Sequence, residues 1–417
     1  MLTCLEYLTV SGRSRIVLSP IGGEIHVVQV PVEELSIYES GASGKELTQL
    51  LSHFPKLTSL NIERCENITE LGVWEQQSGG QQQETKEEHK SRVAITSCEK
   101  IAVIGVSEQQ SGSQQQQTIE EEEIVVTAAG SLLLLPTQLQ KLRLQHCRQL
   151  RIVPSSGSGG DNNEAAGGLQ RLSSLRQLRV ENCPNLLSSY SGSSSCFPFP
   201  TPLEKLELSN LEEVNLDLTN LSNLEELNLS HMEALTNLSV SRSSKLHTLY
   251  IEHSPVVLSV STCSLLSTYL TRLIFKGTKD VEPIAEEALL FLTSLQELQF
   301  GSCHKLQFLP AGLHTLANIY YLRIDECPSP QLLPKDGLPT SLQKLLIEDC
   351  PAIKSLAKYA LPSSLQELVI RKCPEIKSLP KDGLPKSLRL LDVRDDNSEK
   401  LKRQCRRLIG TIPIIMA

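Results

Sequence analysis

The sequence predicts an α/β solenoid with a concave parallel β-sheet, an irregular or 3₁₀ convex side and a C-terminal capping helix. The first observation is a unit, Leu-x-x-Leu-x-Ile/Leu/Val, that recurs along the chain and is often followed by x-x-Cys. The second is a regular step, because the second leucine returns every 21 to 25 residues from Leu206 to Leu391. The third is a change to helical spacing after residue 396. Short turns stacked on one another fit all three observations.

Each unit is expected to form one short β-strand. In Leu-x-Ile two apolar side chains flank an outward one, which is typical of a strand with one buried face. Copies include "LTSLNIERC" from Leu57, "LRQLRVENC" from Leu175 and "LQELVIRKC" from Leu365. About fifteen units can be counted in residues 1–395, with weaker copies at the N-terminal end, including "VAITSC" from Val93. The step is that of leucine-rich repeats, so we expect a leucine-rich repeat horseshoe.

The return path of each turn is expected to be tight and poor in long helices. Proline and glycine are frequent there, as in "LPKDGLP" at Leu333 and again at Leu379. These residues suit turns, and the Leu-x-Ile spacing does not fit a helical stripe. An array of amphipathic helices is therefore disfavoured.

Four polar stretches interrupt the array, near residues 75–92, 107–130, 155–168 and 188–202. They are rich in Gln, Ser, Gly and charge, so we interpret them as surface insertions that form no core. The first two share "EQQSG" and a glutamine run, which indicates a duplicated repeat with its insertion. A specific contact made by the glutamines is the alternative.

Residues 396–417 are expected to form a cap helix and a tail. Asn397 and Ser398 are N-cap candidates, and Gly410 is a plausible stop. The expected buried face carries Leu401, Cys405, Leu408 and Ile409, and the opposite basic face is expected to be solvated, with nucleic-acid or membrane binding as alternatives.

The N-terminal end shows no comparable cap, because Met1 lies almost directly on a repeat. We therefore expect the chain to be a fragment of a longer protein or a truncated gene product. An uncapped sheet end would also favour self-association of the isolated chain.

Eight of the twelve cysteines hold one position of the repeat, which indicates an internal packing column. Redox sensitivity and metal binding are the alternatives. A metal site would need short spacings such as Cys-x-x-Cys, and the sequence contains none. The eight are Cys65, Cys98, Cys147, Cys183, Cys303, Cys327, Cys350 and Cys373.

We expect no enzyme and no bound cofactor or metal, because catalytic motifs are missing from the sequence. The nearest phosphate-loop match, "SGASGKEL" at Ser40, has Glu39 where the motif needs glycine. The net charge of −8 disfavours an obligatory nucleic-acid partner. No apolar run is long enough to span a membrane, and the start lacks the features of a signal peptide. These features predict a cytoplasmic or nucleocytoplasmic protein.

The later repeats carry a family resemblance. The patterns "LxxLxIxxCPxLxSLP" and "LPxxGLPxSL" resemble the leucine-rich repeat region of plant intracellular NB-LRR disease resistance proteins, and "LKRQCRRLIGTIPII" is similar to the ends of such proteins in grasses. The resemblance implies recognition of a protein partner in the plant defence response: a pathogen effector, a host guardee or an NB-ARC-type domain. The nucleotide-binding module itself is not in this sequence, so nucleotide binding is not carried over.

Residues between the repeat leucines are expected to form the binding surface, because they face outward from the concave sheet. Tyr and Arg are favoured anchors of interfaces, so Tyr321 and Arg323 are the first candidates, although any one of these positions is also consistent with an ordinary exposed residue. A general scaffold, decoy or adaptor without an immune role is the alternative function, and a receptor ectodomain is a third. The candidate residues are Arg176, Arg179, Gln296, Gln299, Tyr321, Arg323, Asp325, Lys344, Glu348, Glu367 and Arg371.

Overall fold

The computed structural model contains two compact units, Met1–Leu203 and Glu204–Ala417, and each is described by itself. The residues that the structure describes are 7–11, 34–38, 42, 44–52, 54–57, 59–63, 70–74, 92–96, 103–106, 132–136, 139–146, 151–152, 168–184, 186–187, 199–212, 215–278, 283–285, 287–306, 308–310, 312–328, 337–354, 356, 361–380 and 384–417.

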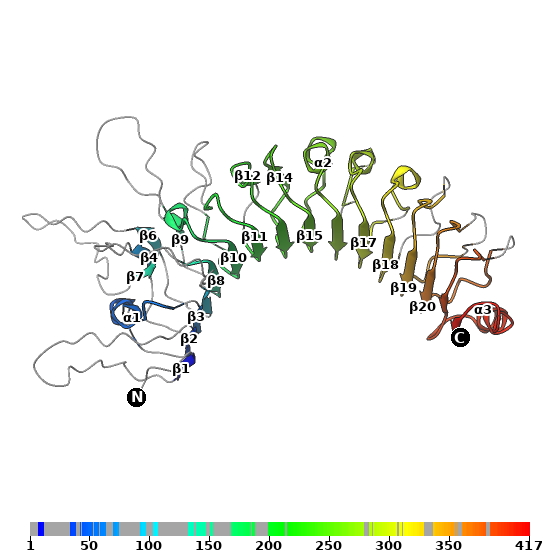
Figure 1. Ribbon diagram of the computed structural model, residues 1–417, viewed down its shortest axis with the longest axis horizontal. Helices are drawn as coiled ribbons and strands as arrows, with labels where there is room; N and C mark the ends of the chain where they lie inside the picture. Colours follow the sequence, from blue (N-terminus) through cyan, green and yellow to red (C-terminus); the bar gives the residue numbers. More distant parts are fainter. Residues whose placement is uncertain are drawn as a thin grey trace, which may run out of the picture. The chain divides into compact units, whose positions relative to one another are not determined.

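The second unit is built on one parallel β-sheet that lines its concave side (Figure 1). Each repeat contributes one strand, and no turn could bury its apolar face without its neighbours. In spatial order the strands are β11 (Lys205–Ser209), β13 (Glu226–Ser230), β15 (Thr248–Glu252), β16 (Arg272–Lys276), β17 (Glu297–Gly301), β18 (Tyr321–Asp325), β19 (Lys344–Glu348), β20 (Glu367–Arg371), β21 (Leu390–Asp392) and β22 (Ile414–Met416).

The repeat leucines are in register across this sheet. Leu227 lies opposite both Leu206 and Leu249, and the pairing continues strand by strand to Leu391. Within a strand the leucine and the residue two positions later are buried, so the other three residues face outward. Phe275 and Phe300 occupy neighbouring core positions and stack with ring centroids 5.7 Å apart. The predicted leucine-rich repeat solenoid is confirmed.

A left-handed turn follows strand after strand. The residue after the strand has a positive φ from Asn210 (54°) to Lys372 (49°). Its N–H donates to the end of the next strand, as His231 N does to Glu252 O at 2.8 Å. Gly277 holds this position after β16, where a Cβ would lie 2.2 Å from the His253 ring, so the ring would have to move to admit a side chain.

The next residue points back into the core, and this is the predicted cysteine position. Four thiols there are fully buried and unbridged, and each donates to the carbonyl two residues earlier at 3.1 to 3.3 Å. They belong to Cys303, Cys327, Cys350 and Cys373. Cys183 is also buried, whereas Cys65, Cys98 and Cys147 lie outside the described residues. Burial agrees with the packing interpretation.

The convex side of the second unit is largely irregular, as expected from its proline and glycine content. Its regular elements are short and lie along the outer rim (Figure 1). They are the parallel pair β12 (Asn215–Leu218) and β14 (Asn237–Val240), helix α2 (Val260–Leu266) and the 3₁₀ helices η3 (Ala288–Phe291) and η4 (Leu313–Thr315).

The predicted cap helix is present but shorter than expected. Helix α3 (Glu399–Arg406) begins at Ser398, whose hydroxyl accepts a hydrogen bond from Leu401 N, and it buries Leu401 and Cys405. Because the helix ends at Arg406, Ile409 leaves the buried face and is 69% exposed, so its predicted place on that face is wrong.

Two features next to α3 were not expected. The chain after the helix forms β22, which pairs with β21 and extends the sheet. Asn397 is buried rather than acting as the N-cap. Its Oδ1 accepts from Cys373 N at 2.9 Å, and its Nδ2 donates to the carbonyls of Ile370 and Val393.

The first unit contains two parallel sheets with helices α1 (Gly44–Leu51) and η1 (Gly168–Arg171). The expected turn at "VAITSC" is present as β5. One sheet holds β1 (Tyr7–Ser11), β2 (Glu34–Tyr38), β3 (Ser59–Glu63), β5 (Arg92–Thr96), β8 (Lys141–Gln145) and β10 (Gln177–Glu181), and the other β7 (Leu132–Pro136), β4 (Glu70–Trp74), β6 (Val103–Val106) and β9 (Arg151–Ile152).

The expected insertions lie almost entirely outside the described residues. Arg92 opens β5 and Gly168 opens η1, so elements resume at the ends of two of them. At the end of the fourth stretch Phe199 is fully buried, so the chain has rejoined the core by that residue.

Candidate protein-binding surface

The concave face of the second unit carries three parallel rows of outward side chains. We define the first row as the first residue of each strand, the centre row as the third and the last row as the fifth. The strands are in register, so residues of one row lie side by side on neighbouring strands, about 4.8 Å apart. Neighbouring side chains can therefore pair along each row.

In the first row, charges of opposite sign alternate and pair across strands. Lys205 Nζ lies 2.9 Å from Glu226 Oε2, and Arg272 Nε lies 3.1 Å from Glu297 Oε2. Lys344 Nζ lies 3.0 Å from Glu367 Oε1. Each pair neutralises itself, so this row offers a partner little net charge.

At the C-terminal end, charges of the last and centre rows compensate each other, because Arg371 lies in the last row and Asp392 lies in the centre row opposite Val369. Asp392 has a side chain only 2% exposed, and it accepts hydrogen bonds from Arg371 of the neighbouring strand and from Arg394 Nη2 at 2.9 Å. Burial alone would raise the pKa of Asp392, but the hydrogen bonds from Arg394 and Arg371 outweigh burial and lower it. Asp392 is therefore a fixed anion held between two cations.

The centre row contains two apolar pairs. Tyr250 and Ile274 are opposite each other on β15 and β16, and Leu346 and Val369 are opposite each other on β19 and β20. All four are half-buried. Three strand steps, about 14 Å, separate Ile274 from Leu346. We name these pairs the first and second apolar centres.

Ion pairs border both apolar centres. The Lys344–Glu367 pair lies beside the second centre on the first row, and Arg371 lies on the other side on the last row. Asp392, the partner of Arg371, follows Val369 in the centre row. Lys276 and Glu252, 3.8 Å apart, border the first centre. Burial and the neighbouring Glu252 raise the pKa of Tyr250, so its hydroxyl stays protonated. Apolar contacts inside a polar rim are the usual anatomy of an interface core.

The structure places nine of the predicted surface residues on or beside this face, and it ties several of them to neighbours. Arg323 Nε donates to Asp325 Oδ1 at 2.9 Å, and its Nη2 lies 3.8 Å from Glu348 Oε2, so Arg323 is a held side chain rather than a free anchor. The nine are Gln296, which precedes β17, and Gln299, Tyr321, Arg323, Asp325, Lys344, Glu348, Glu367 and Arg371, which lie in the strands.

The other two predicted residues belong to the first unit. Arg176 precedes β10, and its Nη1 donates to Pro202 O at 3.2 Å. Arg179 is in β10 and forms an ion pair with Glu181 at 3.2 Å. Both are exposed.

Sequence reasoning missed Tyr250, Ile274 and Val369 as candidates because it favoured polar and charged positions. The signal was present, since an apolar residue stands between the buried pair in "LYI", "LIF" and "LVI". Such a residue lies on the outward face of its strand, where its apolar surface stays accessible to a partner.

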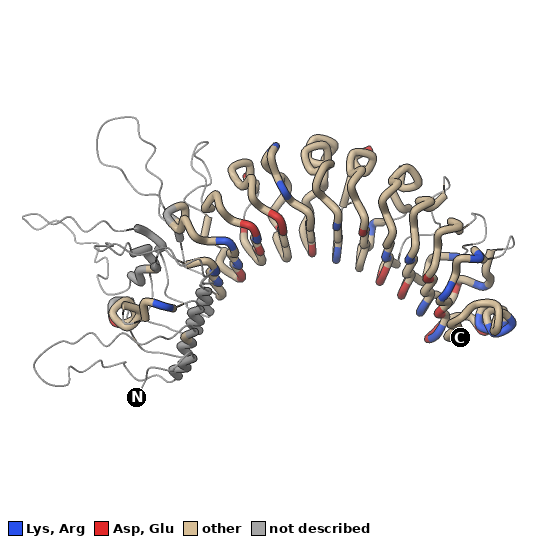
Figure 2. Tube along the Cα trace, in the orientation of Figure 1, with Lys and Arg blue, Asp and Glu red and all other residues tan. Residues whose placement is uncertain are grey.

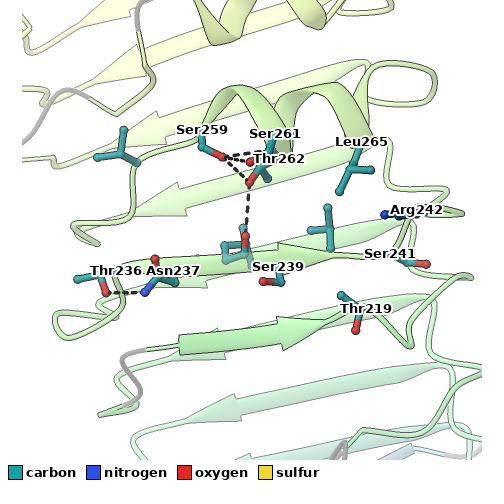
Figure 3. Close-up of a pocket in the computed structure, with 13 residues that line it drawn as sticks. Thr219, Thr236, Asn237, Ser239, Ser241, Arg242, Ser259, Ser261, Thr262 and Leu265 are labelled. Atoms are coloured by element: carbon teal, nitrogen blue, oxygen red, sulfur yellow. Dashed lines mark hydrogen bonds between the residues drawn. The ribbon is translucent and has the colours of Figure 1, made fainter. Parts of the chain in front are cut away.

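A hollow of about 690 Å³ lies on the convex side between β14 and α2 (Figure 3). Its walls are rich in hydroxyl groups, several of which bond to each other, and Thr262 Oγ1 donates to Leu238 O at 3.5 Å. The exposed Arg242 lies at one end of the lining. These contacts join α2 to the short convex sheet.

The described part of the chain contains no helix long and apolar enough to cross a membrane. Among its residues, no group of three or more His, Cys, Asp or Glu side chains is placed to hold a metal ion.

No protein-family model matches the sequence, and no curated protein matches it. Solved leucine-rich repeat structures do match. The leucine-rich repeat domain of the type III effector XopL is 18% identical, with 57% of this chain and 73% of that chain covered and a TM-score of 0.35.

Two other solved structures cover most of this chain. The TLR13–ssRNA13 complex is 15% identical over 89% of this chain and 52% of that chain, with a TM-score of 0.46. YopM from Yersinia enterocolitica WA-314 is 15% identical over 89% and 81%, with a TM-score of 0.25. The similarity is one of repeat architecture.

Proposed function

We propose that this chain is a protein-binding recognition module, and that its partner docks on the concave face of the second unit over the two apolar centres. The observation that carries the proposal is the arrangement of that face, where apolar pairs are bordered by charges already paired with each other. Apolar contacts then supply the affinity, and the ion pairs fix the border and exclude water.

We further propose that the module serves the plant defence response, by sensing a pathogen effector or regulating a nucleotide-binding switch from the cytoplasm or nucleus. The motifs that resemble NB-LRR proteins support this role. The alternative is a general scaffold, decoy or adaptor. Neither role requires catalysis or a cofactor, and we propose none.

The test compares two double variants in capture experiments from grass leaf extract. Leu346→Asp with Val369→Asp places charge in the second apolar centre. Tyr269→Asp with Phe308→Asp makes the same kind of change at exposed side chains outside the strands. We expect the first double variant to lose at least about a hundredfold in affinity for any captured protein that binds the purified chain directly, because two desolvated contacts are removed.

The control double variant should bind as the wild type does. Equal loss in both, or none in the first, would remove the concave face as the site. Direct binding of a purified NB-ARC-type domain or effector supports the defence role, whereas partners of other kinds favour the scaffold alternative. Binding should also change little between about 0.1 and 0.5 M salt, because the charges of this face are internally compensated.

A further inference from the structure

The chain at the C-terminal end of the second unit is rich in Lys and Arg, which the proposed function does not use (Figure 2). Residues 399–417 contain five Lys and Arg residues and one acidic residue, in a chain whose net charge is −8. Leu401 and Cys405 define the buried face of α3. With 3.6 residues per turn, the opposite face is centred on Arg403.

Four exposed cations lie on this outer face, and no ion pair joins them to any described residue. They are Lys400, Arg403, Arg406 and Arg407. The fifth cation, Lys402, is paired, because its Nζ lies 3.8 Å from Glu399 Oε1. Asp395 and Asp396 precede the helix and do not lie on its later turns. The outer face therefore keeps an uncompensated positive charge, unlike the concave face.

An apolar tip follows the basic face directly. Ile409 N donates to Arg406 O at 3.3 Å, so Ile409 is part of the turn that ends α3. It is 69% exposed, the largest value among the exposed large apolar side chains of the described residues. Gly410 follows with φ of 91°, and no atom lies within 4 Å of where its Cβ would be. The tip thus projects into open space.

A second copy of the chain does not suit this surface. Symmetric pairing through the short edge strand β22 would bring two basic helices together, and like charges at close range repel. Charge complementarity instead requires an anionic partner. An exposed aliphatic tip beside unpaired cations combines the two contributions that hold peripheral proteins at a lipid interface, electrostatic attraction and shallow apolar insertion.

We propose that the α3 face and the Ile409 tip form a peripheral docking site for an anionic lipid surface. The cations lie against the headgroups, and Ile409 enters the interface next to them. Docking is reversible, because one aliphatic side chain and four cations are far weaker than a lipid anchor or a membrane-crossing helix. The site is independent of the concave face, so either proposal can fail without the other.

The test is co-sedimentation of the full chain with vesicles of phosphatidylcholine, with or without roughly one-third phosphatidylserine. We expect binding only to the vesicles with phosphatidylserine, and loss of binding at about 0.5 M salt. Arg403→Gln with Arg407→Gln should weaken binding about 30-fold, since each basic residue contributes about fivefold at such a surface. Ile409→Ala should weaken it about tenfold.

The matched control is Arg242→Gln with Lys245→Gln, which removes two exposed charges near the convex hollow and should leave binding within about twofold. Circular dichroism and thermal melting check that each variant is folded before its binding is compared. Absence of binding to the anionic vesicles overturns the proposal, as does equal loss in the control. Binding to poly-glutamate or single-stranded DNA without binding to vesicles also overturns it, and assigns the surface to an acidic polypeptide or a nucleic acid.

Discussion

The repeats from β11 to β16 and those from β17 to β20 share one strand register but fill one buried position differently. The earlier repeats place leucine, methionine, serine and threonine two residues after the strand, and the later ones place cysteine each time. Ser254 is the informative member of the first group, because its hydroxyl accepts from Met232 N at 3.2 Å and donates to Glu252 O at 3.1 Å. The thiol of Cys350 likewise donates to Glu348 O at 3.2 Å.

This difference shows which properties a side chain needs at the buried position two residues after the strand. It lies in the core, so it favours a small apolar group, and it adjoins a backbone carbonyl that can use a donor. A thiol meets both needs, because it packs as an apolar group and donates weakly. The cysteine column therefore needs no catalytic or metal-binding explanation. Asn397 ends the series with the strongest version of the same solution, an amide that bonds to several backbone groups.

The largest expected change in the free energy of unfolding is at Asn397. Asn397→Ala removes the acceptor of Cys373 N and the donor to Ile370 O and Val393 O, all of them buried. We expect a loss of about 3 kcal/mol, since each buried polar group left unpaired costs about 1–3 kcal/mol. The measurement is urea unfolding, and Asn318→Ala, an exposed amide with one backbone contact, should change stability by no more than about 1 kcal/mol. Similar losses of stability in the two variants would show that the buried amide of Asn397 contributes no more than an exposed one.

Alkaline pH should separate the two groups of repeats. Burial raises the pKa of Cys350 to about 12 and that of Cys373 to about 11, from an ordinary value of 9.0. Below pH 9 the thiols are neutral in both the folded and the unfolded chain, so the free energy of unfolding keeps its full value. As pH rises from 9 through the folded pKa values, the thiols of the unfolded chain ionise first, and the fold loses stability. At pH 10 the loss should be about 1.4 kcal/mol for each thiol.

Urea unfolding at pH 8 and pH 10 measures this effect. Cys350→Ser with Cys373→Ser should lose about 3 kcal/mol less than the wild type over that interval, because serine does not ionise there. Equal pH dependence in both proteins would contradict the assignment of neutral, buried thiols.

The smallest expected changes in the free energy of unfolding come from removing the hydroxyl groups of Ser254 and Thr278, which hold the same position of the repeat. Ser254→Ala should lose about 1 kcal/mol, because Met232 N loses its acceptor and Glu252 O keeps only the hydrogen bond from His231 N. The buried Thr278 Oγ1 makes no well-formed hydrogen bond. The pKa of the neighbouring Cys303 thiol is lowered mainly by the Cys327 thiol, and Thr278 adds only a smaller contribution. Thr278→Val should therefore stay within about 0.5 kcal/mol in the same assay. A larger loss at Thr278 than at Ser254 would reverse the interpretation.

Much of this fold could be predicted from the sequence, because the leucine spacing fixes both strand and register. Leu206, Leu298 and Leu391 all occupy the buried strand position that their pattern predicts. The structure of the C-terminal end was harder to predict from the sequence. Helical spacing continued to Ile409, but the chain must leave the helix earlier to reach the edge of β21 and form β22. That tertiary requirement has no local signal in the residues of α3.

The candidate binding surface was only partly predictable. The repeat pattern shows which residues face outward, but it does not show which charges satisfy each other. Arg323 was an attractive anchor in isolation, whereas Asp325 and Glu348 hold it in place. Once the charges are paired, Leu346 and Val369 become the distinctive part of the face. Pairing depends on side-chain reach between turns, and a linear pattern does not contain it.

The two "LPKDGLP" copies, at Leu333 and Leu379, have a genetic consequence. An in-frame exchange between them would excise two whole turns, including β19 and β20. Strand β18 would then meet β21 in the same register, with Arg323 opposite Asp392 and Asp325 opposite Arg394. Opposite charges would still match, and the core leucines would still align. A single recombination event could therefore delete the second apolar centre from a lineage and leave a protein that still folds.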